Sequence, residues 1–198
     1  IVDKIDSLVG FFLINEKPTS SKDPFALRRA AIGLLRIVIE NKLSINLRDL
    51  ISYSVRLYEE QGIQIKNDET EIEILNFLKE RMRNILKLKN VKVDIIEASI
   101  SSHIGDNYLD LYKKNLLMNK YIKKEIGINT ISSYKRASNI TETADKGITG
   151  RPDAVLFRTD EEKMLYEKIN EIRKAFTVKE SNKDYENLLI QLSETKQF

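Results

Sequence analysis

Apolar residues recur every three or four positions along most of the chain, the spacing that places them on one face of an α-helix. The clearest stripe contains Leu27, Leu34 and Val38, within a helix predicted from Asp23 to about Asn41. The same spacing predicts further helices over 1–9, 47–60, 68–89, 106–121, 129–145, 159–176 and from 181 onward. Residues 91–100 are ambiguous, because they alternate like a strand while their neighbours favour a short helix. The pattern therefore predicts an all-α fold.

Capping residues mark the starts of several predicted helices. Asp23 followed by Pro24 favours a helix start, because aspartate accepts hydrogen bonds from free backbone amides and proline tolerates the first helical position. Asn46 is expected to cap the next helix, and Thr159 with Glu162 forms a capping box.

The apolar stripes also predict which side chains are buried. They place Ile72 inside the helix over 68–89 and Tyr112 inside the helix over 106–121. Tyr134 and Ile140 are expected inside the helix over 129–145. A buried ring cannot stack on a nucleic-acid base, so both tyrosines are expected to be structural.

The beginning of the chain is a separate predicted segment. Gly10 is expected to end the helix over 1–9, and the polar, turn-rich residues 17–22 follow. We predict a domain boundary near this loop. The chain begins at Ile1 within a helical pattern and without a methionine, so we expect a piece of a longer protein.

Composition excludes several classes of site. The 198 residues contain no cysteine and one histidine, His103, which rules out disulfides, thiolate zinc sites, thiol nucleophiles and His-rich metal sites within this stretch. Ser101 and Asp106 lie near His103, but this cluster lacks the strand-turn-helix context of a nucleophile elbow. Residues 147–151 match neither the P-loop nor the dinucleotide fingerprint. We therefore expect no active site in this chain, and the absence of a membrane span or signal peptide predicts a cytoplasmic protein.

Charge is concentrated in two segments. Residues 17–36 contain five basic side chains and one acidic one, and residues 111–139 contain seven and one, whereas the whole chain carries only +3. Basic segments with interleaved tyrosines are suited to contacting phosphates and unpaired bases. The alternative is that these lysines form an ordinary solvated face of a helical bundle.

Two stretches carry a family resemblance. Residues 17–31 read KPTSSKDPFALRRAA, and residues 134–140 read YKRASNI. Together with residues 3–12, in the same order and spacing, they resemble the beta subunit of bacterial glycyl-tRNA synthetase, the type with two alpha and two beta subunits. Residues 25–28 are also similar to the D-A-L-R motif of a helical anticodon-binding domain, with Phe25 in place of the aspartate.

The resemblance implies a domain organisation and separate roles for the alpha and beta subunits. It predicts that residues 1–22 are the last helix of an HD-like domain plus a linker, and that residues 23–198 are a DALR-like helical anticodon-binding domain, incomplete at its C-terminal end. The holoenzyme would join glycine to its tRNA with ATP, using ATP and Mg²⁺ in the alpha subunit and tRNA binding by the beta subunit. No cofactor is expected in this chain. Asp3 or Asp6 would be the last HD-type aspartate, but the other metal ligands would lie upstream, so no metal is assigned.

The resemblance also implies candidate RNA-binding residues. These are Lys22, Arg28, Arg29, Lys135, Arg136 and Asn139. Arg36 joins them because it is seven residues from Arg29 and so lies two helical turns away on the same face. Their expected role is contact with the phosphates and bases of the anticodon arm of tRNA-Gly, where a guanidinium can make two parallel hydrogen bonds. The structural alternative is that Arg28 or Arg136 binds carboxylates or helix C-termini within the domain. The functional alternative is a helical scaffold for beta-subunit packing or alpha/beta assembly, and HD-type phosphohydrolase activity is disfavoured because the metal ligands are missing.

Overall fold

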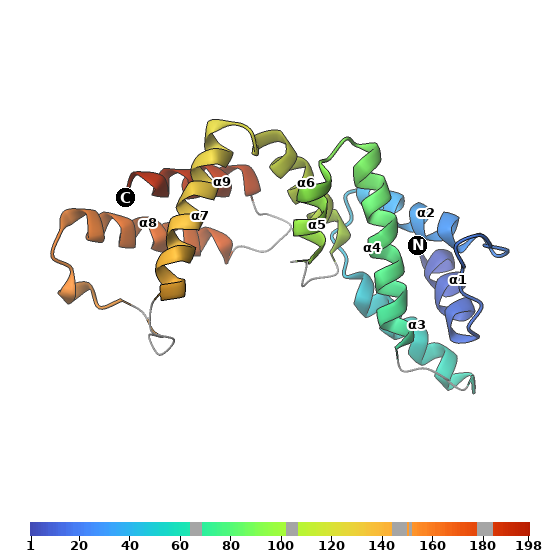
Figure 1. Ribbon diagram of the computed structural model, residues 1–198. Helices are drawn as coiled ribbons and strands as arrows, with labels where there is room; N and C mark the ends of the chain where they lie inside the picture. Colours follow the sequence, from blue (N-terminus) through green and yellow to red (C-terminus); the bar gives the residue numbers. More distant parts are fainter. Residues whose placement is uncertain (64–68, 102–106, 144–149, 151, 178–183) are drawn as a thin grey trace. The chain divides into compact units, whose positions relative to one another are not determined.

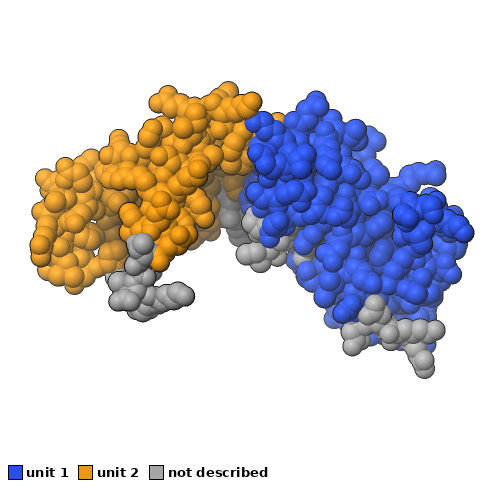
Figure 2. Space-filling view, viewed as in Figure 1, with its two compact units in different colours: residues 1–116 blue, residues 117–198 orange. Residues whose placement is uncertain are grey.

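A computed structural model describes residues 1–63, 69–101, 107–143, 150, 152–177 and 184–198. Within these ranges the chain forms α-helices and short 3₁₀ helices and no strand, which confirms the predicted all-α fold (Figure 1). The helices belong to two compact units, residues 1–116 and residues 117–198 (Figure 2). The domain boundary expected after residue 22 stays a prediction.

Unit 1 (residues 1–116) is built around α4, which packs against α1, α2, α3 and α5. Its core contains Leu34, Leu35, Leu78 and Met82, all completely buried. The elements of this unit are α1 (Val2–Leu13), α2 (Leu27–Glu40), α3 (Leu47–Glu60), α4 (Thr70–Leu88), α5 (Val93–Ser101) and most of α6 (Tyr108–Tyr121).

Unit 2 (residues 117–198) is smaller, and α9 packs against both α7 and α8. Its elements are the end of α6, α7 (Glu125–Thr143), the 3₁₀ helix η1 (Ala154–Leu156), α8 (Asp160–Phe176), α9 (Tyr185–Glu194) and the 3₁₀ helix η3 (Thr195–Gln197). Within the described ranges, no helix is long and apolar enough to cross a membrane.

The local capping signals gave the right starts for two helices. Asn46 accepts a hydrogen bond from the Arg48 amide at the start of α3. Thr159 and Glu162 form both halves of the capping box of α8. The Glu162 carboxylate accepts from the Arg158 and Thr159 amides, and these bonds lower its pKa. Capping succeeded as a predictor here because each cap satisfies amides in its own helix.

The prediction that Gly10 ends the first helix was wrong, because α1 continues to Leu13. Gly10 instead lies against α3: a β-carbon at this position would lie only 2.6 Å from the Tyr58 hydroxyl oxygen, so the end of that side chain would have to move. The glycine therefore gives α3 room against α1, a contact that sequence spacing cannot indicate. Burial raises the pKa of Tyr58.

Two other helix starts were also misplaced. The helix expected from residue 129 begins four residues earlier, at Glu125. The helix expected from Asp23 begins at Leu27, after Ala26 in the left-handed conformation with φ of +54°. Asp23 still caps it from a distance, accepting from the Leu27 amide at 2.8 Å. Asp68 and Ser181, proposed as helix starts, lie outside the described residues.

The buried faces were predicted less well than the helices themselves. Ile72 is 54% exposed, Tyr134 71% and Ile140 65%, although the apolar stripes placed all three inside. Tyr112 is partly buried. Helical spacing shows which residues share a face, but whether another element covers that face depends on tertiary packing.

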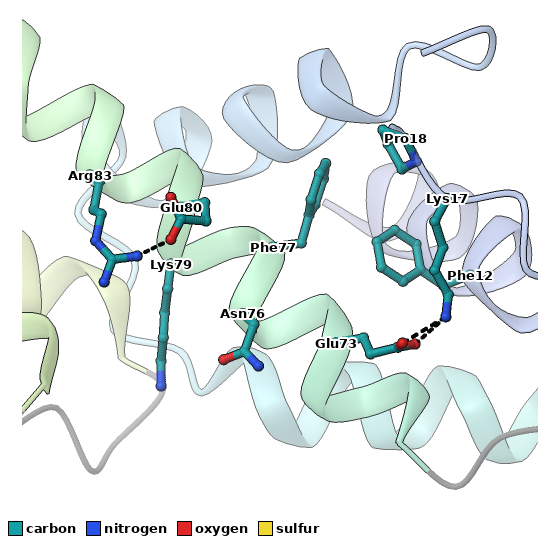
Figure 3. Close-up of a pocket in the computed structure, with 9 residues that line it drawn as sticks. All are labelled: Phe12, Lys17, Pro18, Glu73, Asn76, Phe77, Lys79, Glu80 and Arg83. Carbon is teal, nitrogen blue, oxygen red and sulfur yellow. Dashed lines mark hydrogen bonds and ion pairs between the residues drawn. The ribbon is translucent and has the colours of Figure 1, made fainter. Parts of the chain in front are cut away.

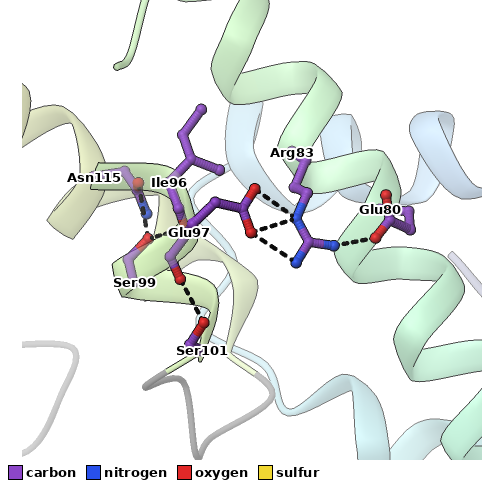
Figure 4. Close-up of polar contacts among 7 residues, drawn as sticks. All are labelled: Glu80, Arg83, Ile96, Glu97, Ser99, Ser101 and Asn115. Atoms are coloured by element: carbon purple, nitrogen blue, oxygen red, sulfur yellow. Dashed lines mark hydrogen bonds and ion pairs between the residues drawn. The ribbon is translucent and has the colours of Figure 1, made fainter. Parts of the chain in front are cut away.

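Polar contacts hold α4, α5 and α6 together in unit 1 (Figure 4). Arg83 of α4 donates through Nε and Nη2 to the carboxylate of Glu97 in α5, at 3.0 to 3.2 Å, and these bonds raise its pKa. Ser99 of α5 donates to the buried Asn115 of α6 at 2.9 Å. The ambiguous residues 91–100 thus contain a helix, α5, whose polar side chains join its two neighbours.

Candidate nucleic-acid interface

The loop before α2 is held in place by its own polar groups. Asp23 accepts from the Leu27 amide through Oδ1 and from the Arg28 amide at 3.0 Å through Oδ2. The Lys22 amide donates to the Thr19 hydroxyl at 3.2 Å, and the Thr19 amide donates to the Lys22 carbonyl at 3.0 Å. These bonds fix the backbone conformation at Lys22.

An aromatic pair ties the same loop to α1. The Phe25 ring stacks on the Phe11 ring, with centroids 4.0 Å apart and planes inclined by 21°. Phe25 stands where the D-A-L-R motif has aspartate, so the aromatic contact gives this position a structural use that an aspartate would not have. The loop is therefore a preformed support for its charged residues.

Four predicted site residues lie on this support and the following helix, and we call them the α2 basic cluster: Lys22, Arg28, Arg29 and Arg36. Lys22 and Arg29 are exposed, and neither side chain has an ion pair or hydrogen bond within the part of the chain that the structure describes. Arg36 is exposed but pairs with Glu40, with Nη2 and Oε1 2.9 Å apart. Among the described residues, Lys22 and Arg29 are therefore unpaired cations. Arg36 is only weakly neutralised, since exposed ion pairs contribute little to stability.

Arg28 makes contacts within its own unit. Its guanidinium donates to the Thr19 carbonyl and lies 4.0 Å from Asp23 Oδ2, so it braces the loop. Whether Arg28 also contacts RNA stays a prediction.

The remaining predicted site residues lie on α7, and we call them the α7 basic cluster: Lys135, Arg136 and Asn139. All three are exposed. Lys135 has no ion pair among the described residues, whereas Arg136 donates to the Lys196 carbonyl of η3 at 3.5 Å. The adjacent ring of Tyr134 is exposed, contrary to the prediction, so α7 presents an aromatic surface beside its cations.

The two basic clusters are in different units, and each is therefore considered separately. Each contains one exposed cation, Arg29 or Lys135, that has no ion pair among the described residues. Beside it is an arginine that makes contacts within its own unit, Arg28 or Arg136. Free surface cations can bind phosphate without first breaking an internal ion pair.

Two other lysines of the second basic segment form ion pairs with acidic side chains. Lys114 pairs with Asp110 at 2.6 Å, and Lys120 pairs with Glu186 at 3.1 Å. The Tyr121 hydroxyl also donates to Glu186, and this bond with that of Lys120 lowers the pKa of the carboxyl. Two of the seven basic side chains in this segment therefore connect α6 to itself and to α9.

A pocket of about 430 Å³ lies in unit 1 beside residues 17–18 (Figure 3). Its charged walls are largely paired with one another: Lys17 with Glu73 at 2.6 Å, and Arg83 with Glu80. Sequence reasoning did not find it, because the pocket joins the end of α1 and its loop to a distant helix, α4. The Lys17–Glu73 pair connects the loop to α4, whereas the Arg83–Glu80 pair lies within α4. Together the two pairs leave few charges of this pocket available to a ligand.

The serine and histidine cluster noted in the sequence is mostly outside the described residues, which include Ser101 but not His103 or Asp106. The Ser101 hydroxyl donates to the Glu97 carbonyl at 2.7 Å, a bond within its own helix. Among the residues described, no group of three or more His, Cys, Asp or Glu side chains could hold a metal ion.

Comparison with known proteins gives a family for this arrangement. The family model described as glycyl-tRNA synthetase beta subunit matches residues 1–101. A protein of Rickettsia canadensis named glycine–tRNA ligase beta subunit is 41% identical over 191 residues, which cover 96% of this chain and 27% of that protein. Its namesake in Rickettsia africae is 39% identical over 193 residues, covering 98% of this chain and 27% of that protein.

A more distant relative has the same name. The glycine–tRNA ligase beta subunit of Clostridioides difficile is 32% identical over 173 residues, covering 87% of this chain and 24% of that protein. The chain thus spans about a quarter of the length of the curated relatives it matches. The similarity to these relatives extends past residue 101 into unit 2.

Proposed function

The chain belongs to the glycyl-tRNA synthetase beta-subunit family, and on this premise we propose that it is a tRNA-binding part of a glycine–tRNA ligase. Its exposed cations would contact the anticodon arm of tRNA-Gly. The observation that carries this proposal is the α2 basic cluster, where Lys22 lies on a loop braced by Arg28 and Asp23, and Arg29 lies in the first turn of α2. Neither Lys22 nor Arg29 has an ion pair among the residues that the structure describes. Fixing the backbone in advance reduces the entropy lost when these side chains bind phosphate.

The proposed holoenzyme is a cytoplasmic heterotetramer of two alpha and two beta subunits. ATP and Mg²⁺ would be bound by the alpha subunit, where they supply the activated glycyl adenylate. This chain would hold the tRNA so that its acceptor end reaches that site. Such a role requires positive charge and shape but no general acid, base or nucleophile.

The proposal is tested by one substitution in the full beta subunit. Arg29→Ala should weaken tRNA-Gly binding by about tenfold and reduce the slope of log affinity against log salt by about 1, because one phosphate contact is lost. The measurement is a fluorescence titration at several salt concentrations, with glycylation assayed in the presence of the alpha subunit.

The matched control for this test is Arg173→Ala, which removes an exposed arginine of α8 that has no ion pair within the described ranges. It should leave both affinity and slope unchanged. Equal effects of the two substitutions would contradict a specific role for Arg29.

The second candidate function is a helical scaffold that binds protein and not RNA. It is favoured by Arg136, which contacts a backbone carbonyl of its own unit, and by the exposed apolar residues of unit 2. A scaffold predicts that changes at Arg29 and Lys135 leave RNA binding untouched, while loss of apolar surface residues prevents assembly.

A further inference from the structure

A lysine of α1 lies on the surface of α2, beside the α2 basic cluster. Lys4, in the first turn of α1, crosses α2 at Gly33: a β-carbon on this glycine would lie 3.1 Å from Lys4 Cε, 3.5 Å from Cδ and 3.7 Å from Nζ. The outer half of the lysine side chain therefore lies in the space that the glycine leaves open. Periodicity along either helix alone gives no sign of this contact, because it joins two different helices.

Gly33 lies between two arginines of the α2 basic cluster. Arg29 is four residues before it and Arg36 three residues after it, and such residues share a face of an α-helix. The two arginines are about 10 Å apart along the helix axis, at 1.5 Å per residue. The Lys4 ammonium lies at the level of Gly33, so three cations follow one another along this face of α2.

These three cations have little negative charge around them. Neither Lys4 nor Arg29 has an ion pair in the part of unit 1 that the structure describes. Arg36 pairs with Glu40, but the two side chains are 65% and 60% exposed, so water and salt weaken the pair. Like charges gathered on one surface repel one another in the free protein, and a bound anion relieves this repulsion.

We propose that Lys4 binds phosphate and that, with Arg29 and Arg36, it forms a track for neighbouring phosphates of one RNA strand. This inference rests on the proposed function, because it places the RNA on the α2 basic cluster. With Lys4 between the arginines, successive cations are about 5 Å apart along the axis of α2. This separation is smaller than the Debye length of about 8 Å at physiological salt, so the three charges act together on the same stretch of RNA backbone.

The structural alternative is that Lys4 only covers Gly33 with its methylene groups, as lysine stems often cover surfaces of this kind. Two substitutions separate the charge from the packing. Lys4→Met keeps an unbranched side chain against α2 and removes the ammonium, whereas Lys4→Arg keeps the positive charge. A packing role requires only the side-chain stem, and a phosphate contact requires the charge.

The test is a salt-dependent titration of the full beta subunit with tRNA-Gly. Lys4→Met should weaken binding about fivefold near 0.1 M salt and reduce the slope of log affinity against log salt by about 1, because one phosphate contact is lost. Its melting temperature should not fall, and Lys4→Arg should retain most of the affinity. An unchanged slope in Lys4→Met would overturn the proposal.

The matched control is Lys89→Met, the same substitution at an exposed lysine that ends α4 and has no ion pair among the described residues. It should change neither affinity nor slope. Equal losses in Lys4→Met and Lys89→Met would show that only net charge matters and would overturn a contact at Lys4.

Chemical labelling of the unmodified sequence gives a second measurement. With an amine-reactive ester and peptide mass spectrometry, saturating tRNA-Gly should slow the reaction of Lys4 at least about fivefold and leave Lys89 unchanged, because an ammonium held by phosphate is shielded. Equal reactivity of Lys4 with and without tRNA-Gly would contradict the proposal, whatever the stability of the variants.

The inference and the proposed function fail in different ways. A beta subunit that does not bind tRNA-Gly at all would overturn both. If Arg29→Ala weakens binding and Lys4→Met does not, the tRNA-binding role stands and Lys4 is a packing residue only.

Discussion

Gly127→Ala should destabilise unit 2 by about 3 kcal/mol, the upper end of the usual cost of forcing an extra methyl group into a filled site. This loss of stability is the opposite of the usual result, because replacing glycine by alanine within a helix normally stabilises it by about 1 kcal/mol. Gly127 lies in the first turn of α7 and is buried. A β-carbon there would overlap the Tyr121 carbonyl oxygen and lie 2.9 Å from the Ile122 α-carbon.

The obstruction at Gly127 is backbone, so no side-chain rotation can relieve it. The Tyr121 carbonyl also accepts from the Lys124 amide at 2.8 Å in the turn that joins α6 to α7. An added methyl group would have to open this turn, and α7 would shift away from α6. The loss of order should spread to α9, which packs on α7.

Urea or thermal unfolding followed by circular dichroism measures the Gly127 effect. The matched control is Gly62→Ala, the same chemical change at a position with φ of +84° and no atom near the added carbon. The control should cost about 1 kcal/mol through left-handed strain alone. A Gly127→Ala variant no less stable than Gly62→Ala would show that the turn between α6 and α7 is not as close as described.

The second large effect is expected from reversing both free charges of the α2 basic cluster. A beta subunit with Lys22→Glu and Arg29→Glu should bind tRNA-Gly about 100-fold more weakly near 0.1 M salt, because two attractions are lost and two repulsions from phosphate are added. Folding should be unaffected, because both side chains are exposed and neither has an ion pair within the described residues.

The comparison for this double variant is Lys87→Glu with Lys89→Glu. These two lysines are also exposed and free of ion pairs in the described part of unit 1, but they lie at the end of α4, outside the α2 basic cluster. This variant carries the same change in net charge and should retain most of its affinity. Similar losses in the two variants, measured by filter binding, would mean that overall charge and not the α2 basic cluster determines binding.

Features that depend on residues close together in the chain were predicted from the sequence, and features that depend on distant residues were not. The caps at Asn46 and Thr159 were correctly predicted because donor and acceptor lie within three residues. Gly10 was misread because its neighbour in space, Tyr58, is 48 positions away in the chain. The exposure of Tyr134 could not be read from periodicity, which defines a face but does not say whether anything covers it.

For the candidate site, the sequence indicated the kinds of residue present but not the contacts that each of them makes. The family resemblance indicates Arg28 and Arg29 as RNA-binding residues, and it leaves open that Arg28 binds groups within the domain instead. It could not show that Arg28 braces the loop while Arg29 stays free, since this depends on the position of the Thr19 carbonyl nine residues away. An apolar groove in unit 2, built from α7, α8, α9 and η3, left no signal in the sequence beyond the apolar stripes themselves.

A salt titration can test whether the beta subunit recognises tRNA-Gly through this chain. The full beta subunit would be titrated with tRNA-Gly and with a tRNA of different anticodon at increasing salt, and the comparison repeated with the Arg29→Ala variant. We expect a preference for tRNA-Gly that persists as salt rises and that is weakened by Arg29→Ala, because base contacts are less sensitive to salt than phosphate contacts. Equal binding of both tRNAs that vanishes with salt, or a preference unchanged by Arg29→Ala, would mean that Arg29 takes no part in recognising tRNA-Gly.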